Sequence, residues 1–164
     1  YPCFQFLGPS PIDYDTHKAY GECVWEELCH FNLSDKIRDG KKKLGIIFNM
    51  DPHTKGGSHW VSLFVDLNPG KKFIFYMDSN GEKIPKRIHK LVKTIQKQAA
   101  SAGVPLEFIE NMIEHQRGDT ECGMYSLYTI IQLLKNTRSL NYFTGQRIPD
   151  KHVEKFRKEY FNAN

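Results

Sequence analysis

Two short runs of β-forming residues joined by a turn constrain the fold of this chain most strongly. The runs occupy residues 60–66 and 73–77 and are rich in Val, Ile and aromatic residues. The segment between them, Asn68-Pro-Gly-Lys-Lys72, has the Asn, Pro and Gly that are typical of a turn. The sequence therefore predicts an antiparallel hairpin, in which the start of the first strand lies beside the end of the second.

Two polar residues mark that shared edge of the predicted hairpin. His59 precedes the first strand, directly after a Gly-Gly-Ser segment, and Asp78 follows the second strand. A carboxylate beside an imidazole can hold the ring in the tautomer and orientation that a general base requires. We therefore expect His59 and Asp78 to lie together and to act as a pair.

A cysteine at the predicted start of a helix is the candidate for the group on which this pair acts. After Cys122, apolar residues recur at helical spacing, at Met124, Leu127, Ile130, Ile131, Leu133 and Leu134. The unpaired N–H groups and the positive end of the helix dipole favour a thiolate at this position. Cys122 is thus a candidate nucleophile with His59 as its base.

Acyl transfer through a thiolate also needs donors for the oxyanion that it creates. The side-chain amide of Gln116, six residues before Cys122, can supply one donor. The backbone N–H of Cys122 can supply a second.

These spaced motifs resemble the ubiquitin-like-protein protease family, the clan of cysteine peptidases that contains the SUMO proteases and the adenovirus protease. The motifs are His59-Trp60, an aspartate that ends the next strand before Ser79, and Gln116 six residues before Cys122-Gly123. The phrases at residues 57–66, 115–127 and 147–157 are most similar to the branch found in large cytoplasmic DNA viruses, which includes the polyprotein protease of African swine fever virus. The likeness runs from roughly residue 45 to residue 161 and is thinner upstream.

The resemblance implies a cysteine endopeptidase with the papain-like architecture of that family and no cofactor or metal. His59, Asp78 and Cys122 would form the catalytic triad, and Gln116 would help to bind the oxyanion. Trp60 and Gly123 would contact the substrate, which in this family presents Gly-Gly or Gly-X at the cleaved bond.

The second aromatic wall of the substrate channel departs from the family pattern. SUMO proteases carry it in a Trp-Leu-Asn-Asp motif, which this sequence lacks. Residues 4–15 and Trp25 are the alternatives that the sequence offers.

The resemblance leaves several functions open. The viral phrases favour polyprotein processing at Gly-Gly-type sites, whereas the wider family favours removal of ubiquitin, SUMO or a related modifier. An acyltransferase and an inactive binding module on the same scaffold are further alternatives. Acyltransferases of the clan often carry Glu in place of Asp78, and the intact set of four residues argues against an inactive module.

Each candidate residue also has an ordinary structural interpretation. Cys122 and Trp60 could be core residues, Asp78 could cap its own turn, and Gln116 could be a solvated loop residue. Their mutually compatible positions favour the active-site interpretation.

The remaining pattern predicts an α+β fold with a mixed or antiparallel central sheet flanked by helices. Besides the hairpin, we expect strands near residues 44–49 and 105–114. Helices are expected near residues 16–31, 85–100 and 149–160, and from Cys122 onward. We expect one catalytic domain over residues 1–164, with residues 1–44 as its least defined part.

Composition agrees with a compact enzyme. A chain of 164 residues with 40% hydrophobic content can bury a core. Its apolar runs fall short of the roughly 20 residues that a membrane helix needs, and no signal peptide is visible. We therefore expect a soluble, cytoplasmic protein without membrane partners, located in the host cytoplasm or the virion if it is viral.

The four cysteines, Cys3, Cys23, Cys29 and Cys122, are sparse. A disulfide scaffold is not expected, which favours a reducing compartment. Cys23, Cys29 and His30 lack the paired spacing of common zinc motifs, so the sequence favours no metal site.

The net charge of +4 raises the alternative of nucleic-acid binding through the lysine-rich helix at residues 85–100. A solvated face around an apolar stripe of Ile88, Leu91, Val92 and Ile95 explains the same pattern. No aromatic platform or Gly-rich phosphate loop accompanies these lysines. The expected partner is therefore a protein substrate.

Overall fold

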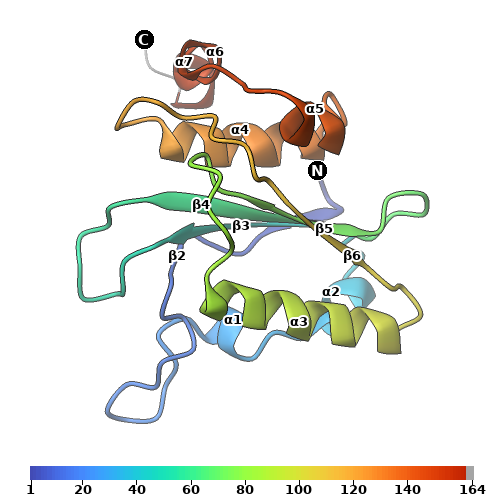
Figure 1. Cartoon of the computed structure of the whole chain (residues 1–164). Coiled ribbons are helices and arrows are strands. Elements are labelled where there is room, and N and C mark those ends of the chain that lie inside the picture. Colours follow the sequence, from blue (N-terminus) through green and yellow to red (C-terminus); the bar gives the residue numbers. More distant parts are fainter. Residues whose placement is uncertain (162–164) are drawn as a thin grey trace.

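A single mixed sheet lies at the centre of the computed structural model, which describes residues 1–161 (Figure 1). Its strands are β1 (Phe4–Phe6), β2 (Ser10–Pro11), β3 (Lys43–Asn49), β4 (Trp60–Asp66), β5 (Phe73–Met77) and β6 (Glu107–Glu110). The helices are α1 (Glu26–Cys29), α2 (Leu33–Arg38), α3 (Lys86–Ser101), α4 (Cys122–Leu134), α5 (Leu140–Gly145), α6 (Asp150–Glu154) and α7 (Arg157–Phe161). The α+β class with helices around a mixed sheet is as predicted.

The predicted hairpin is present. Strands β3, β4 and β5 are antiparallel neighbours, while β1, β2 and β6 join them in parallel. Ser62 lies opposite Met77 and Asp66 opposite Phe73. This register brings the start of β4 and the end of β5 to the same edge of the sheet.

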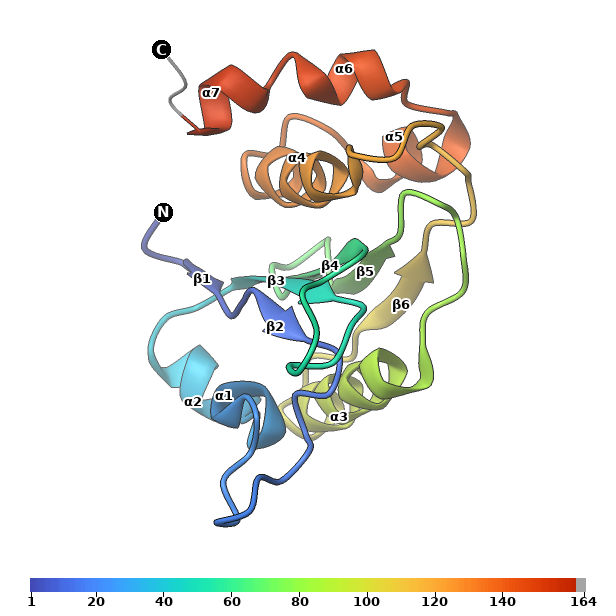
Figure 2. The ribbon, with the colours of Figure 1, turned by 90° about the vertical axis from the view of Figure 1, so that its left-hand side faces the viewer.

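Helices cover both faces of the sheet (Figure 2). Side chains alternate along β4, so Leu63 and Val65 enter one core with α1, α2 and α3, and Phe64 enters the other with α4, α5 and α6. Because both faces are covered, β4 and β5 are apolar along nearly their whole length.

Lys43 ties the far end of α4 to the sheet. Its buried ammonium group donates hydrogen bonds to the carbonyl oxygens of Leu133 and Leu134, at 3.2 and 3.1 Å, and to Asn136. A cation at the last turn satisfies carbonyl groups that have no partner within the helix. The helix is thereby held in place at the end opposite Cys122.

The basic helix α3 has the predicted arrangement. Its apolar stripe is buried against the sheet, and its lysines are exposed. Arg87 and Lys90 also pair with Asp15, at 3.3 and 2.7 Å, so the chain itself neutralises part of this positive surface. No helix within residues 1–161 is long and apolar enough to cross a membrane.

The N-terminal region differs from the prediction. The helix expected at residues 16–31 is only the short α1, because a turn between Lys18 and Glu22 folds the chain back before it. This turn pairs His17 with Cys23, and Gly21 takes a φ of +85° that suits glycine. Cys23 and Cys29 are joined by a disulfide, which the sequence analysis did not anticipate.

Other boundaries also need correction. The strand expected over residues 105–114 is limited to β6, because the side chain of Asn111 bonds to the backbone of Asp78 and Ile113 and starts a loop. The last predicted helix is divided into α6 and α7. Short elements β1, β2, α2 and α5 were not predicted, since elements of two to six residues carry little periodicity.

Candidate active site

His59 and Asp78 meet at the predicted edge of the sheet. Nε2 of His59 lies 2.8 Å from Oδ1 of Asp78, which is almost fully buried. The same carboxylate oxygen accepts the backbone N–H of Asn80 at 2.8 Å, and Asn111 donates to the backbone carbonyl of Asp78. Asp78 therefore caps its turn and also orients the imidazole, so both interpretations of this residue apply.

Cys122 is the first residue of α4 and faces this pair. His59 and the backbone N–H groups of Trp60 and Gly123 lie near enough to its thiol to lower the pKa of that group. As the first residue of the helix, Cys122 also has a backbone N–H without an intrahelical partner. With Nε2 of His59 engaged by Asp78, Nδ1 is the ring nitrogen left for the thiol.

These contacts shift the pKa values of both His59 and Cys122. The hydrogen bond with Asp78 and then that with Cys122 raise the pKa of His59 to about 10, against the opposing effect of burial. Burial also opposes ionisation of Cys122, but the hydrogen bonds from His59, Trp60 and Gly123 outweigh it and lower the pKa of the thiol. The two shifts favour a thiolate–imidazolium pair near neutral pH.

Gln116 lies in the loop between β6 and α4, anchored at both ends of its amide. Its Oε1 accepts the Ser79 hydroxyl at 2.7 Å, and its Nε2 donates to the carbonyl oxygen of Gly118 at 2.8 Å. The amide nitrogen carries two N–H donors, and Gly118 takes one of them. Because Ser79 follows Asp78 directly, this bond attaches the loop to the same sheet edge.

Asp150, at the start of α6, is a positioning residue that the sequence analysis did not single out. Its carboxylate accepts the backbone N–H groups of Arg117 and Gly118, at 3.1 and 3.0 Å, and the Tyr125 hydroxyl at 2.8 Å. It thus fixes the loop from Gln116 to Cys122 against α4. No local sequence signal could have identified it, because its partners lie 25 to 33 residues away.

A cleft of about 630 Å³ opens beside the thiol. Both residues predicted to contact the substrate, Trp60 and Gly123, line it together with Cys122. Phe6 and Pro9 line it from the N-terminal segment. Trp25, the other candidate for a second wall, instead packs against the core on the α3 side of the sheet.

Comparison with known proteins places this arrangement in a family. Residues 34–164 match the Ulp1 protease family, C-terminal catalytic domain. The chain belongs to the Ulp1 protease family. This membership confirms the resemblance that the spaced motifs indicated.

Proteases of large DNA viruses are among the similar proteins. A putative thiol protease of Acanthamoeba polyphaga mimivirus is 35% identical over 135 residues, which cover 82% of this chain and 42% of that protein. A cysteine protease of African swine fever virus is 34% identical over 118 residues, covering 71% of this chain and 43% of that one. In other isolates the African swine fever virus protein is named a SUMO-1 cysteine protease.

A crystal structure of the African swine fever virus protease superposes on 93% of this chain with a TM-score of 0.77 and 25% identity. That alignment covers 58% of the viral chain. This chain therefore spans about two fifths of the curated relatives named above, at 42% and 43% of their length.

Alkylation tests the lowered pKa of Cys122, because only the thiolate reacts. We expect iodoacetamide to modify Cys122 faster than the other free cysteine, Cys3, in mildly acidic buffer, with a rate midpoint below the usual thiol value of about 8.5. His59→Gln should move that midpoint upward. Peptide mass spectrometry at a series of pH values gives both rates. Identical profiles for the two cysteines, or a midpoint unchanged in His59→Gln, would contradict the assignment.

Proposed function

We propose that this chain is the catalytic part of a cysteine endopeptidase that cleaves after glycine at Gly-Gly-X sites and processes a viral polyprotein. The observation that carries the proposal is the hydrogen bond between Asp78 and His59 at 2.8 Å, beside a Cys122 thiol whose pKa His59 lowers. Family membership and the cleft beside the thiol support the same activity.

In the proposed reaction, the Cys122 thiolate attacks the carbonyl carbon of the glycine before the cleaved bond. His59, as imidazolium, then gives its proton to the departing amine. The resulting thioester is hydrolysed by water, from which neutral His59 takes a proton, and collapse of the second intermediate regenerates the thiolate. Asp78 stabilises the imidazolium and keeps Nδ1 directed at the thiol. No cofactor takes part.

The oxyanion would be bound by two donors of different origin. One is the backbone N–H of Cys122, at the positive end of α4. The other is the amide N–H of Gln116 that Gly118 leaves free. Ser79 and Gly118 hold that amide in one orientation, which is the preorganisation that such a donor requires.

The shape and chemistry of the cleft support a glycine-rich substrate strip. Trp60 presents a half-buried aromatic wall next to His59, and Phe6 and Pro9 supply an apolar surface from β1 and the segment after it. Because glycine has no side chain, a glycine strip can pass between these walls and still bring its carbonyl group to the thiol. We assign Phe6 and Pro9 as the second wall.

The polyprotein role is supported by relatives from large DNA viruses at 34% and 35% identity. It would place the enzyme in the host cytoplasm or the virion. Removal of a ubiquitin-like modifier is the second candidate, because a relative is named a SUMO-1 cysteine protease. A modifier-directed enzyme must also offer a large docking surface for a folded protein, whereas a polyprotein protease can act on extended peptides.

A probe panel separates these substrates. We expect the protein to cleave short Gly-Gly-X reporter peptides, Cys122→Ala to be inactive, and ubiquitin and SUMO propargylamide probes to give no adduct. Cys3→Ser is the matched control and should keep full activity. Peptide cleavage is followed by fluorescence and adducts by intact mass.

Two other outcomes of this panel would count against the proposal. A Cys122-dependent adduct with either modifier would replace polyprotein processing by deconjugation. The absence of both peptide cleavage and adducts would contradict peptidase activity. It would favour an acyltransferase or an inactive binding module.

The oxyanion role of Gln116 predicts a loss in turnover. Gln116→Glu keeps the size of the side chain but replaces the N–H donors with a carboxylate, so kcat should fall by about 100- to 1000-fold. KM should change much less, because the donor acts on the intermediate. Gln146→Glu, at an exposed site, is the matched control. A kcat within a factor of about two of the parent protein would exclude this role for Gln116.

A further inference from the structure

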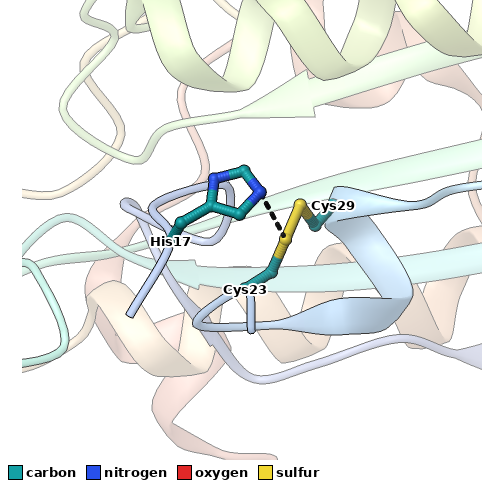
Figure 3. A group of neighbouring side chains, drawn as sticks. All are labelled: His17, Cys23 and Cys29. Carbon is teal, nitrogen blue, oxygen red and sulfur yellow. Dashed lines mark hydrogen bonds between the residues drawn. A yellow bond between two sulfur atoms is a disulfide. The ribbon is translucent and has the colours of Figure 1, made fainter. Parts of the chain in front are cut away.

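A second cluster of reactive side chains lies in the N-terminal segment, on the α3 side of the sheet. The side chains of His17, Cys23 and Cys29 come together there, and their ligand atoms lie within 4.8 Å of one another (Figure 3). His30 approaches Cys23 as well, in a second group that includes Glu26. Cys23 is buried at the centre of both groups.

The distances around Cys23 suit a metal with sulfur and nitrogen ligands. Its Sγ lies 3.8 Å from Nε2 of His17 and 3.7 Å from Nε2 of His30. A tetrahedral zinc ion with bonds of about 2.3 Å to sulfur and about 2.0 Å to nitrogen keeps such atoms about 3.5 Å apart. Each histidine therefore lies within a few tenths of an ångström of this spacing from Cys23. His30 and the pair His17 and Cys29 belong to separate groups, so their side chains must turn toward one another around Cys23 once the disulfide is opened.

A turn and a short helix bring His17, Cys23 and Cys29 together, although each is six positions from the next. The turn between Lys18 and Glu22 brings His17 opposite Cys23. Cys29 and His30 lie at the end of α1, which folds back on this turn. The carboxylate of Glu26 accepts the backbone N–H of Cys23 at 2.6 Å and lies 3.2 Å from His30, so it adds negative charge beside the cluster.

We propose that, when Cys23 and Cys29 are reduced, His17, Cys23, Cys29 and His30 bind one zinc ion. The spacing of Cys23, Cys29 and His30 alone does not indicate this site, because His17 joins it only through the turn. Two thiolates and two neutral imidazoles would make the Zn²⁺ site electrically neutral, which suits the burial of Cys23. They would also complete the four protein ligands of a closed structural site.

The disulfide and the zinc complex are alternative states of one cysteine pair. Reduction by a dithiol supplies two electrons and two protons, which break the sulfur–sulfur bond and leave two thiols and the oxidised reductant. Zinc binding then displaces the two thiol protons. Two-electron oxidation of the complex re-forms the disulfide and releases the ion.

Either state would cross-link residues 17–30 between points at which the N-terminal segment is anchored to the rest of the molecule. Tyr14 and Leu28, on either side of the cluster, are buried in the core with α3. Asp13 accepts hydrogen bonds from the backbone and ring of His53, at 2.8 and 2.6 Å, in the loop that leads to His59. The cluster lies before residues 34–164, the region matched by the family.

Metal content tests this proposal without any measurement of activity. The experiment uses the Cys122→Ala protein, since the catalytic cysteine and His59 could themselves bind metal. After reduction with a phosphine, incubation with Zn²⁺ and gel filtration, we expect one zinc per chain by elemental analysis. Co²⁺ in place of Zn²⁺ should give the visible bands of a tetrahedral thiolate complex.

Matched variants identify the ligands. Cys29→Ser and His17→Gln should each abolish stoichiometric zinc binding and the cobalt bands, whereas Cys3→Ser and His89→Gln should retain both. Circular dichroism checks the fold of each variant, and exposed His17 carries the test if Cys29→Ser is unfolded.

Two results would overturn the site. One is a chain whose thiols are shown to be reduced but which binds no metal. The other is undiminished binding in a folded His17→Gln variant. Neither result depends on whether the chain is a peptidase.

Discussion

The hydrogen bond between His59 and Asp78 depends on the pairing of β4 with β5, and the proposed chemistry depends on that bond. The two residues are 19 positions apart, and the hairpin register brings them to 2.8 Å. Because both strands are buried on both faces, a slip of one residue would move every side chain into the core on the opposite face, where the packing is different. The same packing that stabilises the sheet therefore fixes the orientation of the imidazole.

Cys122 is brought to the same edge of the sheet by α4 and by the loop between β6 and α4. Lys43 holds one end of α4, while Asp150 and Ser79 fix the loop that precedes its other end. Cys122 is thus placed by Lys43, Ser79 and Asp150, none of which lines the substrate cleft. This arrangement explains why the C-terminal helices belong to the catalytic unit although they supply none of the proposed catalytic groups.

The helices and strands that have a periodic or β-rich residue pattern could be predicted from the sequence. The two runs of β-forming residues and the turn between them at residues 60–77 predicted the hairpin, and helical spacing predicted α3 and a helix starting at Cys122. From these elements alone, the meeting of His59 with Asp78 followed. The resemblance to a protease family supplied the proposed roles of these residues. The match of residues 34–164 to the Ulp1 family confirms that resemblance.

Contacts between distant segments were beyond such reasoning. The bonds of Asp150 to Gly118 and of Ser79 to Gln116 join residues 32 and 37 positions apart, with no periodic signal for either. Phe6 reached the cleft because β1 pairs in parallel with β3, and three residues give no strand pattern. His17 met Cys23 through a turn inside a segment that had been predicted as helix.

The ionisation of His59 is the most direct test of the central claim, that Asp78 and Cys122 hold its ring as an imidazolium. Nuclear magnetic resonance of the labelled imidazole would follow its protonation against pH in the parent protein, Asp78→Asn and Cys122→Ala. The account predicts that His59 in the parent protein stays protonated far above its ordinary pKa of about 6.5, towards the value of about 10, and that both substitutions lower this pKa. A parent His59 that titrates near about 6.5, and does so equally in Asp78→Asn, would contradict it.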